Sequence, residues 1–151
     1  MACRIYIDAD ACPVKEETYK VAARHQVPVT VVSNSFLRVP RDPGITQIVV
    51  DAGADVADDW IAERADAHSV VITADILLAE RCLLSGAAVL APNGKPFTAA
   101  SIGSQVATRA LMDQLRGSGE ITGGAPPFSA KDRSAFLQSL HETLTRRRRN
   151  A

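Results

Sequence analysis

The sequence is poor in cysteine, balanced in charge and free of long apolar runs, and each absence excludes a class of protein. Its 151 residues contain three widely spaced cysteines, Cys3, Cys12 and Cys82. Such spacing makes neither a disulfide framework nor a zinc motif of the Cys-x-x-Cys type, so we expect reduced thiols and a cytoplasmic location. Lys plus Arg and Asp plus Glu number 17 each, so the net charge is zero and gives no global argument for nucleic acid as a partner.

Two further absences concern secretion and membranes. The beginning of the sequence lacks a basic segment followed by an apolar one, so we expect no signal peptide. No apolar run approaches the ~18 residues that cross a membrane, so we expect no membrane partner. The apolar share of 46% is ordinary for a soluble globular protein, and the length fits one domain with one core.

Strand-like and helical segments alternate over the first part of the chain, about residues 1–92. We expect strands at residues 3–7, 27–32, 45–50, 69–73 and 87–91, and helices at residues 13–25, 56–66 and 77–84. Strands that alternate with helices indicate a mainly parallel sheet covered on both faces. The prediction is therefore an α/β protein with three layers and a central sheet of about five strands.

The pattern changes in the last third of the chain. We expect a helix at 101–116, a loop rich in Gly and Pro at 117–127 and a last helix at 129–147. Ser129 and Asp132 stand at the start of the last helix as in a capping box, with Asp in place of Glu or Gln. This helical extension, about residues 100–148, is too short and too broken for its own core. We therefore predict that it packs on the first part within a single domain, 1–151.

The first expected strand stops at two carboxylates, Asp8 and Asp10. Residues two apart on an extended segment point the same way, so both carboxylates could face one cation. Ligands of open α/β sheets bind beyond the carboxyl ends of the strands, where these residues would lie. The alternative interpretation is that one Asp caps the following helix and the other is solvated.

Acidic residues also follow the third and fourth expected strands. The third strand leads into Asp55, Asp58 and Asp59 at the start of a helix, and the fourth ends at Asp75. In a parallel sheet these ends lie at one edge, so the acids converge there. Carboxylates with no His or Cys beside them favour a hard cation, Mg²⁺ or Mn²⁺. The alternative is that acids at helix N-termini complement the helix dipole, which explains the acids at 55–59 better than Asp75.

Four segments carry a resemblance to a known family. They are IYIDADACPV (5–14), DVADDWI (55–61), VITADILLA (71–79) and TGGAPPFSAKDR (122–133). Through these motifs, in this order and nearly end to end, the chain resembles the YaiI/YqxD family, bacterial proteins of unassigned function. That family is similar in turn to PIN-like and NYN-like nuclease domains.

The resemblance implies a PIN-like fold and a set of site residues. It places Asp8, Asp58 and Asp75 at the catalytic, metal-binding positions, with Asp10 and Asp59 as neighbouring metal ligands. The implied activity is Mg²⁺- or Mn²⁺-dependent cleavage of RNA or another phosphodiester. In such a site the metal lowers the pKa of a bound water and offsets charge on the scissile phosphate.

Four further residues are candidates for substrate binding, each with an ordinary alternative. They are Lys15, Asn34, Arg38 and Arg133. The alternatives are a solvated helix face for the first, a turn residue for the second, loop packing for the third and a structural ion pair for the fourth. The closing run of arginines, 146–149, could add nonspecific phosphate affinity, but a solvated helix end is the expected state.

Some residues with chemical potential carry no assignment. Cys12 is not expected to be a nucleophile, because nearby carboxylates raise its pKa and no His is adjacent. Trp60 is expected in the core. The three histidines, His25, His68 and His141, are scattered and are expected to form no cluster.

Two other functions fit parts of the sequence. An Asp-x-Asp after a first strand also opens the haloacid-dehalogenase-like phosphatases, in which the first Asp is the nucleophile. Thr73 could serve as the Ser/Thr that those enzymes need, but no suitable Lys is found. The other alternative is a non-catalytic PIN-like module that binds RNA or a protein, which the neutral charge mildly favours.

Overall fold

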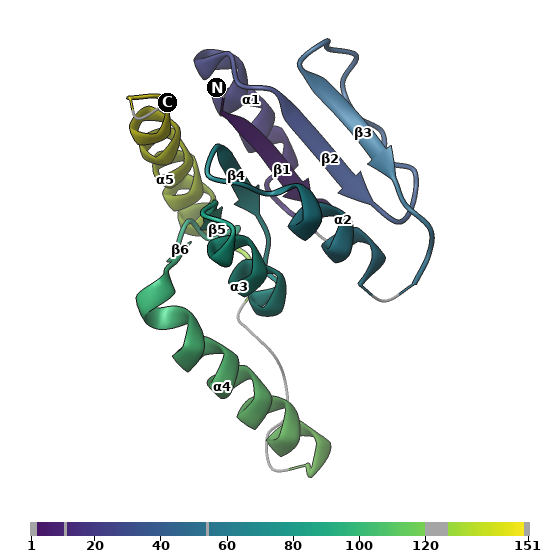
Figure 1. Cartoon of the computed structure of the whole chain (residues 1–151), viewed down its shortest axis with the longest axis vertical. Helices are drawn as coiled ribbons and strands as arrows, with labels where there is room; N and C mark the ends of the chain where they lie inside the picture. Colours follow the sequence, from purple (N-terminus) through teal and green to yellow (C-terminus); the bar gives the residue numbers. More distant parts are fainter. Residues whose placement is uncertain (1–2, 11, 54, 120–126, 150–151) are drawn as a thin grey trace.

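The computed structural model describes residues 3–10, 12–53, 55–119 and 127–149. Within these residues the protein is α/β, with one six-stranded sheet and five helices (Figure 1). The strands are β1 (Arg4–Asp8), β2 (Val29–Ser33), β3 (Ile45–Val49), β4 (Ser69–Ile72), β5 (Ala88–Leu90) and β6 (Pro96–Phe97). The helices are α1 (Lys15–His25), α2 (Val56–Arg64), α3 (Ile76–Leu84), α4 (Ala99–Gly117) and α5 (Ala130–Arg149).

The order of the strands creates a crevice at one edge of the sheet. That order is β3-β2-β1-β4-β5-β6, with β1 to β5 parallel and β6 antiparallel to β5. The chain builds outward from β1 to β3, then returns and builds in the other direction from β4. In doubly wound sheets the crevice lies where the direction reverses, beyond the carboxyl ends of the strands. Here the reversal falls between β1 and β4.

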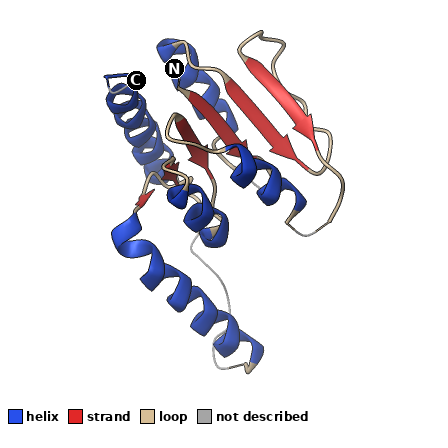
Figure 2. Ribbon diagram, in the orientation of Figure 1, coloured by secondary structure: helices blue, strands red, loops and turns tan. Residues whose placement is uncertain are grey.

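Helices cover both faces of the sheet (Figure 2). Side chains alternate along β1, so Ile5 and Ile7 face one side and Tyr6 faces the other. The first two lie in a buried cluster with α1 and α5 that includes Phe136. Tyr6 lies in a second cluster with α2 and α3 that includes Leu78. The predicted α/β class, the mainly parallel sheet and the three layers are confirmed.

The bounds of the predicted elements differ by one or two residues from those observed, and two differences have a clear physical reason. Strand β6 is not predicted, because it is two residues long and begins with Pro96, which has no amide to donate to a neighbouring strand. Helix α1 begins at Lys15 rather than at Pro13, since Val14 has the non-helical backbone of an N-cap. The loop predicted at 117–127 lies mostly outside the described residues.

Helix α5 crosses one face of the sheet from the carboxyl edge to the amino edge. The predicted capping box at its start is confirmed: the amide of Ser129 donates to Asp132 at 3.0 Å, and the amide of Asp132 donates to the Ser129 hydroxyl at 3.2 Å. Near this start the helix backbone at Ala135 touches the turn after β5. A Cβ on Gly94 would lie 2.6 Å from that backbone, and Gly94 has φ +89°, so only glycine fits there.

The structure corrects the expectation about the histidines and, for Arg147, the expectation about the closing run of arginines. His25 and His141 do meet, with Nε2 of the first 2.9 Å from Nδ1 of the second. Arg147 is not merely solvated, because its guanidinium donates to the carbonyls of Ala67 and Gly86. These contacts join residues between 61 and 116 positions apart, so no local pattern announces them.

Trp60 is half-buried and packs edge-on against Tyr6, with ring centroids 5.9 Å apart. The guanidinium of Arg64 lies 4.0 Å from the centroid of the Trp60 ring.

Helix α4 extends away from the sheet (Figure 1), and Ile102 is its one buried residue. None of the helices in the described part of the chain has the length and apolar character needed to span a membrane.

Candidate functional site

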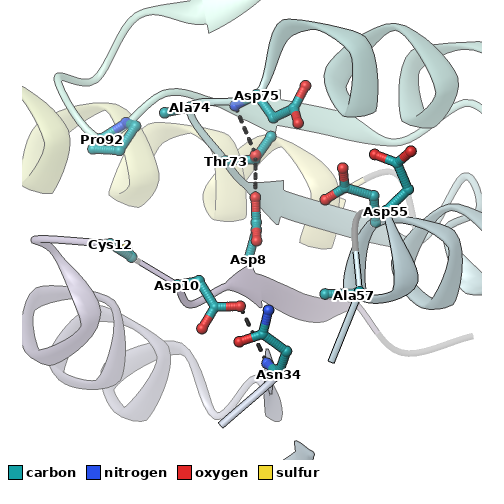
Figure 3. Close-up of a pocket in the computed structure, with 12 residues that line it drawn as sticks. Asp8, Asp10, Cys12, Asn34, Asp55, Ala57, Thr73, Ala74, Asp75 and Pro92 are labelled. Carbon is teal, nitrogen blue, oxygen red and sulfur yellow. Dashed lines mark hydrogen bonds between the residues drawn. The ribbon is translucent and has the colours of Figure 1, made fainter. Parts of the chain in front are cut away.

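A cavity of about 450 Å³ lies at the carboxyl edge of the sheet, at the reversal between β1 and β4. Figure 3 shows the side chains around it. Five carboxylates line this cavity, from the end of β1, the start of α2 and the start of α3: Asp8, Asp10, Asp55, Asp58 and Asp75. Among the described residues that line it there is no Lys, Arg or His. We call it the acidic cavity.

Thr73 links the ends of β1 and β4. Its hydroxyl donates to Oδ2 of Asp8 at 2.7 Å and accepts from the amide of Asp75 at 2.9 Å (Figure 3). Thr73 is buried, so this short chain of bonds holds Asp8 in one orientation. Burial raises the pKa of Asp8, and the charges of Asp75 and Asp10 add to the rise, while the Thr73 hydroxyl opposes it.

Asp75 has a structural task as well as a place in the cavity. It is the N-cap of α3, and its Oδ1 accepts from the amides of Leu77 at 2.9 Å and Leu78 at 3.2 Å. The capping interpretation, which the sequence favours less for Asp75 than for the acids at 55–59, therefore holds for it. These bonds use one oxygen of the carboxylate and fix the direction of the other.

Asp58 enters the cavity from the first turn of α2. Its pKa is raised to about 7, chiefly by burial and then by the charges of Asp75 and Asp8. A side-chain interaction with Asp75 adds to this rise. Three carboxyl groups from β1, α2 and the end of β4 are thus close enough to oppose one another's ionisation, and no cationic side chain among the described residues of the cavity offsets them.

The other wall of the cavity carries Asp10 and Asn34. The backbone amide of Asn34 donates to Oδ2 of Asp10 at 3.1 Å (Figure 3). Cys12 also lines this wall, and burial raises the pKa of its thiol, with Asp8 and Glu17 adding to the rise. The thiol is therefore protonated at neutral pH, which agrees with the expectation that it is not a nucleophile.

The comparisons with known proteins decide the family. The model described as "Uncharacterized BCR, YaiI/YqxD family" matches residues 6–146. The chain belongs to the YaiI/YqxD family. It is 64% identical over 146 residues to a UPF0178 protein of Sphingopyxis alaskensis, covering 96% of this chain and 95% of the relative. It is 60% identical over 143 residues to a UPF0178 protein of Bradyrhizobium diazoefficiens, covering 95% of this chain and 86% of the relative.

The family match confirms the predicted resemblance. Relatives of the YaiI/YqxD family carry the name UPF0178 protein, which assigns no activity. No solved structure matches the chain. The chemistry of this family member therefore has to be argued from the side chains around the acidic cavity.

Several predicted site residues lie away from the acidic cavity of this YaiI/YqxD protein. Asp59 points outward and pairs with Arg81 at 2.7 Å. Lys15 donates to the carbonyl of Cys12 at 3.0 Å, and with Arg38 it lines a different hollow. Arg133 pairs with Glu17 and lies 5.2 Å from the ring centroid of Phe128, so it has the structural ion pair that the sequence offered as an alternative.

Asp55 is the residue of the cavity that the sequence places least well. It stands at the N-cap of α2, but its side chain makes no capping bond, and its backbone is left-handed with φ 68°. Asp and Asn are the non-glycine residues that most readily adopt this conformation. The signal was its position directly after a strand-ending turn that contains Gly53, but only the backbone direction shows that its carboxylate lines the cavity.

The donor set of the acidic cavity fits a hard divalent cation, because carboxylate and amide oxygens are the ligands that Mg²⁺ and Mn²⁺ prefer. Within the residues that the structure describes, however, no three His, Cys, Asp or Glu side chains stand as a ready set of ligands for one ion. The bonds of Asp8 to Thr73, of Asp75 to α3 and of Asp10 to Asn34 each hold one oxygen elsewhere. A metal site here stays a prediction.

Proposed function

We propose that this YaiI/YqxD protein is a Mg²⁺- or Mn²⁺-dependent phosphodiesterase or nuclease whose site is the acidic cavity. One observation carries the proposal: Asp8, Asp58 and Asp75, from three separate elements, meet at the sheet reversal with raised pKa values on the first two. Perturbed carboxyl groups in a cleft are typical of functional sites. The PIN-like fold that the sequence resemblance implies supports the same chemistry by fold analogy alone.

The residues that would hold the cation are Asp8, Asp58 and Asp75, with Asp10 beside them. When bound, a divalent cation lowers the pKa of a bound water and offsets negative charge on a phosphodiester. At neutral pH the three carboxyl groups retain part of a proton because Asp58 titrates near 7. A cation that takes the place of this proton gains the Coulomb attraction of the whole group.

The surrounding residues position the carboxylates for this task. Thr73 holds Asp8, and the first amides of α3 hold Asp75 so that its second oxygen remains for a ligand. Asp10 is exposed and held by the amide of Asn34, so we assign it to orienting the attacking water. Asp59 has no part in this proposal, because Arg81 neutralises it outside the cavity.

The phosphatase alternative is weaker on the same geometry. A haloacid-dehalogenase-like site needs a lysine beside its nucleophilic Asp, and no lysine is among the described residues of the acidic cavity. Thr73 has its hydroxyl on Asp8 and its acceptor side on the Asp75 amide, so it is already committed to the fold. Trapping a phospho-aspartate at Asp8 would reverse this ranking.

The test is calorimetry of Mn²⁺ binding to the wild type, Asp75→Asn and Asp59→Asn. Asparagine caps a helix as well as aspartate does, so Asp75→Asn removes a charge from the cavity and keeps α3 capped. We expect micromolar binding in the wild type, no measurable binding in Asp75→Asn and wild-type affinity in the matched control Asp59→Asn. Equal affinity in all three proteins would rule out this site for the metal.

A substrate screen follows the binding test. Oligoribonucleotides and oligodeoxyribonucleotides are incubated with Mn²⁺ and wild-type protein, and cleavage is followed by gel electrophoresis. We expect cleavage that chelation abolishes. Metal binding without cleavage of any phosphodiester would instead support the non-catalytic module that binds RNA or a protein.

A further inference from the structure

We propose that the opposite, amino edge of the sheet carries a second binding site, which takes a phosphate group of a nucleic-acid strand. A cavity of about 400 Å³ lies there, and Arg146 and Arg147 of α5, Thr143 one turn earlier and His68 before β4 are among the residues that line it. We call it the basic cavity. It does not share residues with the acidic cavity, so it stands or falls separately from the proposed cleavage.

Arg147 is held in place by the fold. Its guanidinium donates to the carbonyl of Ala67 and, at 3.1 Å, to the carbonyl of Gly86. Both carbonyls belong to turns that precede strands, and Gly86 has φ +87°, which lets the chain turn sharply after α3. A guanidinium has five N–H donors, so three remain for a ligand after these bonds. A fixed guanidinium also loses little further entropy when it binds.

The arginines of this edge are not directly paired with neighbouring acids within the described residues. Among the described residues none of the four arginines at 146–149 forms an ion pair with Asp or Glu. The nearby Asp66 is already occupied, since it pairs with Arg4 at 3.4 Å and accepts from the amide of His68 and the hydroxyl of Ser69. Glu142, one turn before Arg146, accepts from Gln138.

This surplus of donors matches a phosphate group. The forked guanidinium binds phosphate oxygens through two parallel hydrogen bonds, and two such groups with an imidazole suit an anion with several oxygens. Thr143 is buried and gives its hydroxyl to the carbonyl of Ser139, so it shapes the wall and leaves recognition to the arginines. The zero net charge of the chain conceals this site, because five of its acids line the acidic cavity at the other edge.

The experiment measures the anisotropy of a fluorescein-labelled single-stranded oligonucleotide at low salt in EDTA, so that the acidic cavity holds no metal and cleaves nothing. The proteins are the wild type, Arg146→Gln, the double variant Arg146→Gln/Arg147→Gln, and Arg149→Gln. The last is the matched control, because it removes the same charge from the same helix but does not line the basic cavity. Thermal unfolding of each variant is recorded alongside.

We expect the double variant to bind about tenfold or more weakly, Arg146→Gln to bind severalfold more weakly and Arg149→Gln to bind like the wild type. Arg146 is exposed, and within the described part of the chain its side chain makes no hydrogen bond to the backbone, so Arg146→Gln keeps the test valid if the double variant unfolds. Inorganic phosphate should displace the oligonucleotide.

Three outcomes are decisive. An equal loss in Arg149→Gln would overturn the proposal, because the affinity would then come from diffuse charge rather than from this cavity. Absence of binding to both the oligonucleotide and inorganic phosphate would overturn it as well. Binding of inorganic phosphate alone, lost in Arg146→Gln, would support the phosphate site and identify free phosphate rather than a nucleic-acid strand as its source.

Discussion

The two edges of the sheet differ in charge and in the way the chain builds them. At the carboxyl edge five carboxylates line one cavity, and at the amino edge two arginines and a histidine line another. At the first edge, links of two or three residues position Asp75 on α3, and the hydroxyl of Thr73 holds Asp8 from the end of β4. The second depends on Arg147 reaching Ala67, 80 residues earlier. The zero net charge of the chain thus conceals two edges of opposite charge.

This difference separates chemistry from affinity. Carboxylates in a crevice hold cations and repel a polyanion, whereas arginines attract one. If both proposals hold, the acidic cavity acts only when a metal reverses its local charge, and the basic edge supplies the attraction at all times. The predictions below test each edge separately, in order of the expected effect.

Asp8→Asn should abolish Mn²⁺-dependent cleavage, with a loss of about 100-fold or more, because it removes a charge at the centre of the acidic cavity. Initial rates on an oligonucleotide measure the effect. Asp59→Asn, which breaks the pair with Arg81 outside the cavity, should keep wild-type rates. Unchanged turnover in Asp8→Asn would remove the acidic cavity from the reaction.

Gly94→Ala should destabilise the protein by about 3 kcal/mol. Alanine disfavours the left-handed backbone of this position, and its Cβ would meet the α5 backbone. Chemical denaturation measures this loss. Since α5 carries the arginines, oligonucleotide binding in EDTA should weaken more than Mn²⁺ binding does. A loss of metal binding with intact oligonucleotide binding would mean that α5 does not organise the basic edge.

Asp58→Asn should stabilise the metal-free protein at about pH 8 by on the order of 1 kcal/mol. Solvent screens the charge of this partly exposed side chain, so the gain is smaller than the full pKa shift would give. The folded pKa of about 7 lies above the ordinary 3.8, so the folded protein binds more protons between these values. The stability of the wild type therefore falls as pH rises from about 4 to about 7. Thermal unfolding measured against pH should show a smaller fall in the stability of the variant. An identical slope in both proteins would contradict this prediction.

The smallest effect is expected at His25. Burial, His141 and Arg148 lower the pKa of this imidazole from its ordinary 6.5, so the unfolded chain takes up its proton first. Stability should therefore fall as pH drops from about 6.5 through the lowered folded value, by less than about 1 kcal/mol. Unfolding is best measured in the Asp58→Asn background, where the opposing pH dependence of the Asp58 carboxyl group is removed. Adding His141→Gln should diminish the fall, and an unchanged fall would assign it to another group.

The predictions from sequence were most successful where local pattern sets the outcome. Alternating apolar segments predicted the parallel sheet and its helices, and Ser129 with Asp132 predicted the start of α5. Acids at strand ends predicted that Asp8, Asp58 and Asp75 would gather at one edge, as they do. Asp59 could not be separated from Asp58 in this way, because neighbours on one helix turn differ only in direction.

What the amino-acid pattern determined is what depends on neighbours in the chain: the periodicity of strands and helices, the caps, and the family to which the motifs belong. The tertiary structure alone decided which neighbouring acids enter the acidic cavity and which distant side chains meet. It turned Asp55 inward through a left-handed backbone, paired His25 with His141 and carried Arg147 to the amino edge. These contacts join distant segments, and their energies depend on burial and distance, which exist only after the sheet has formed.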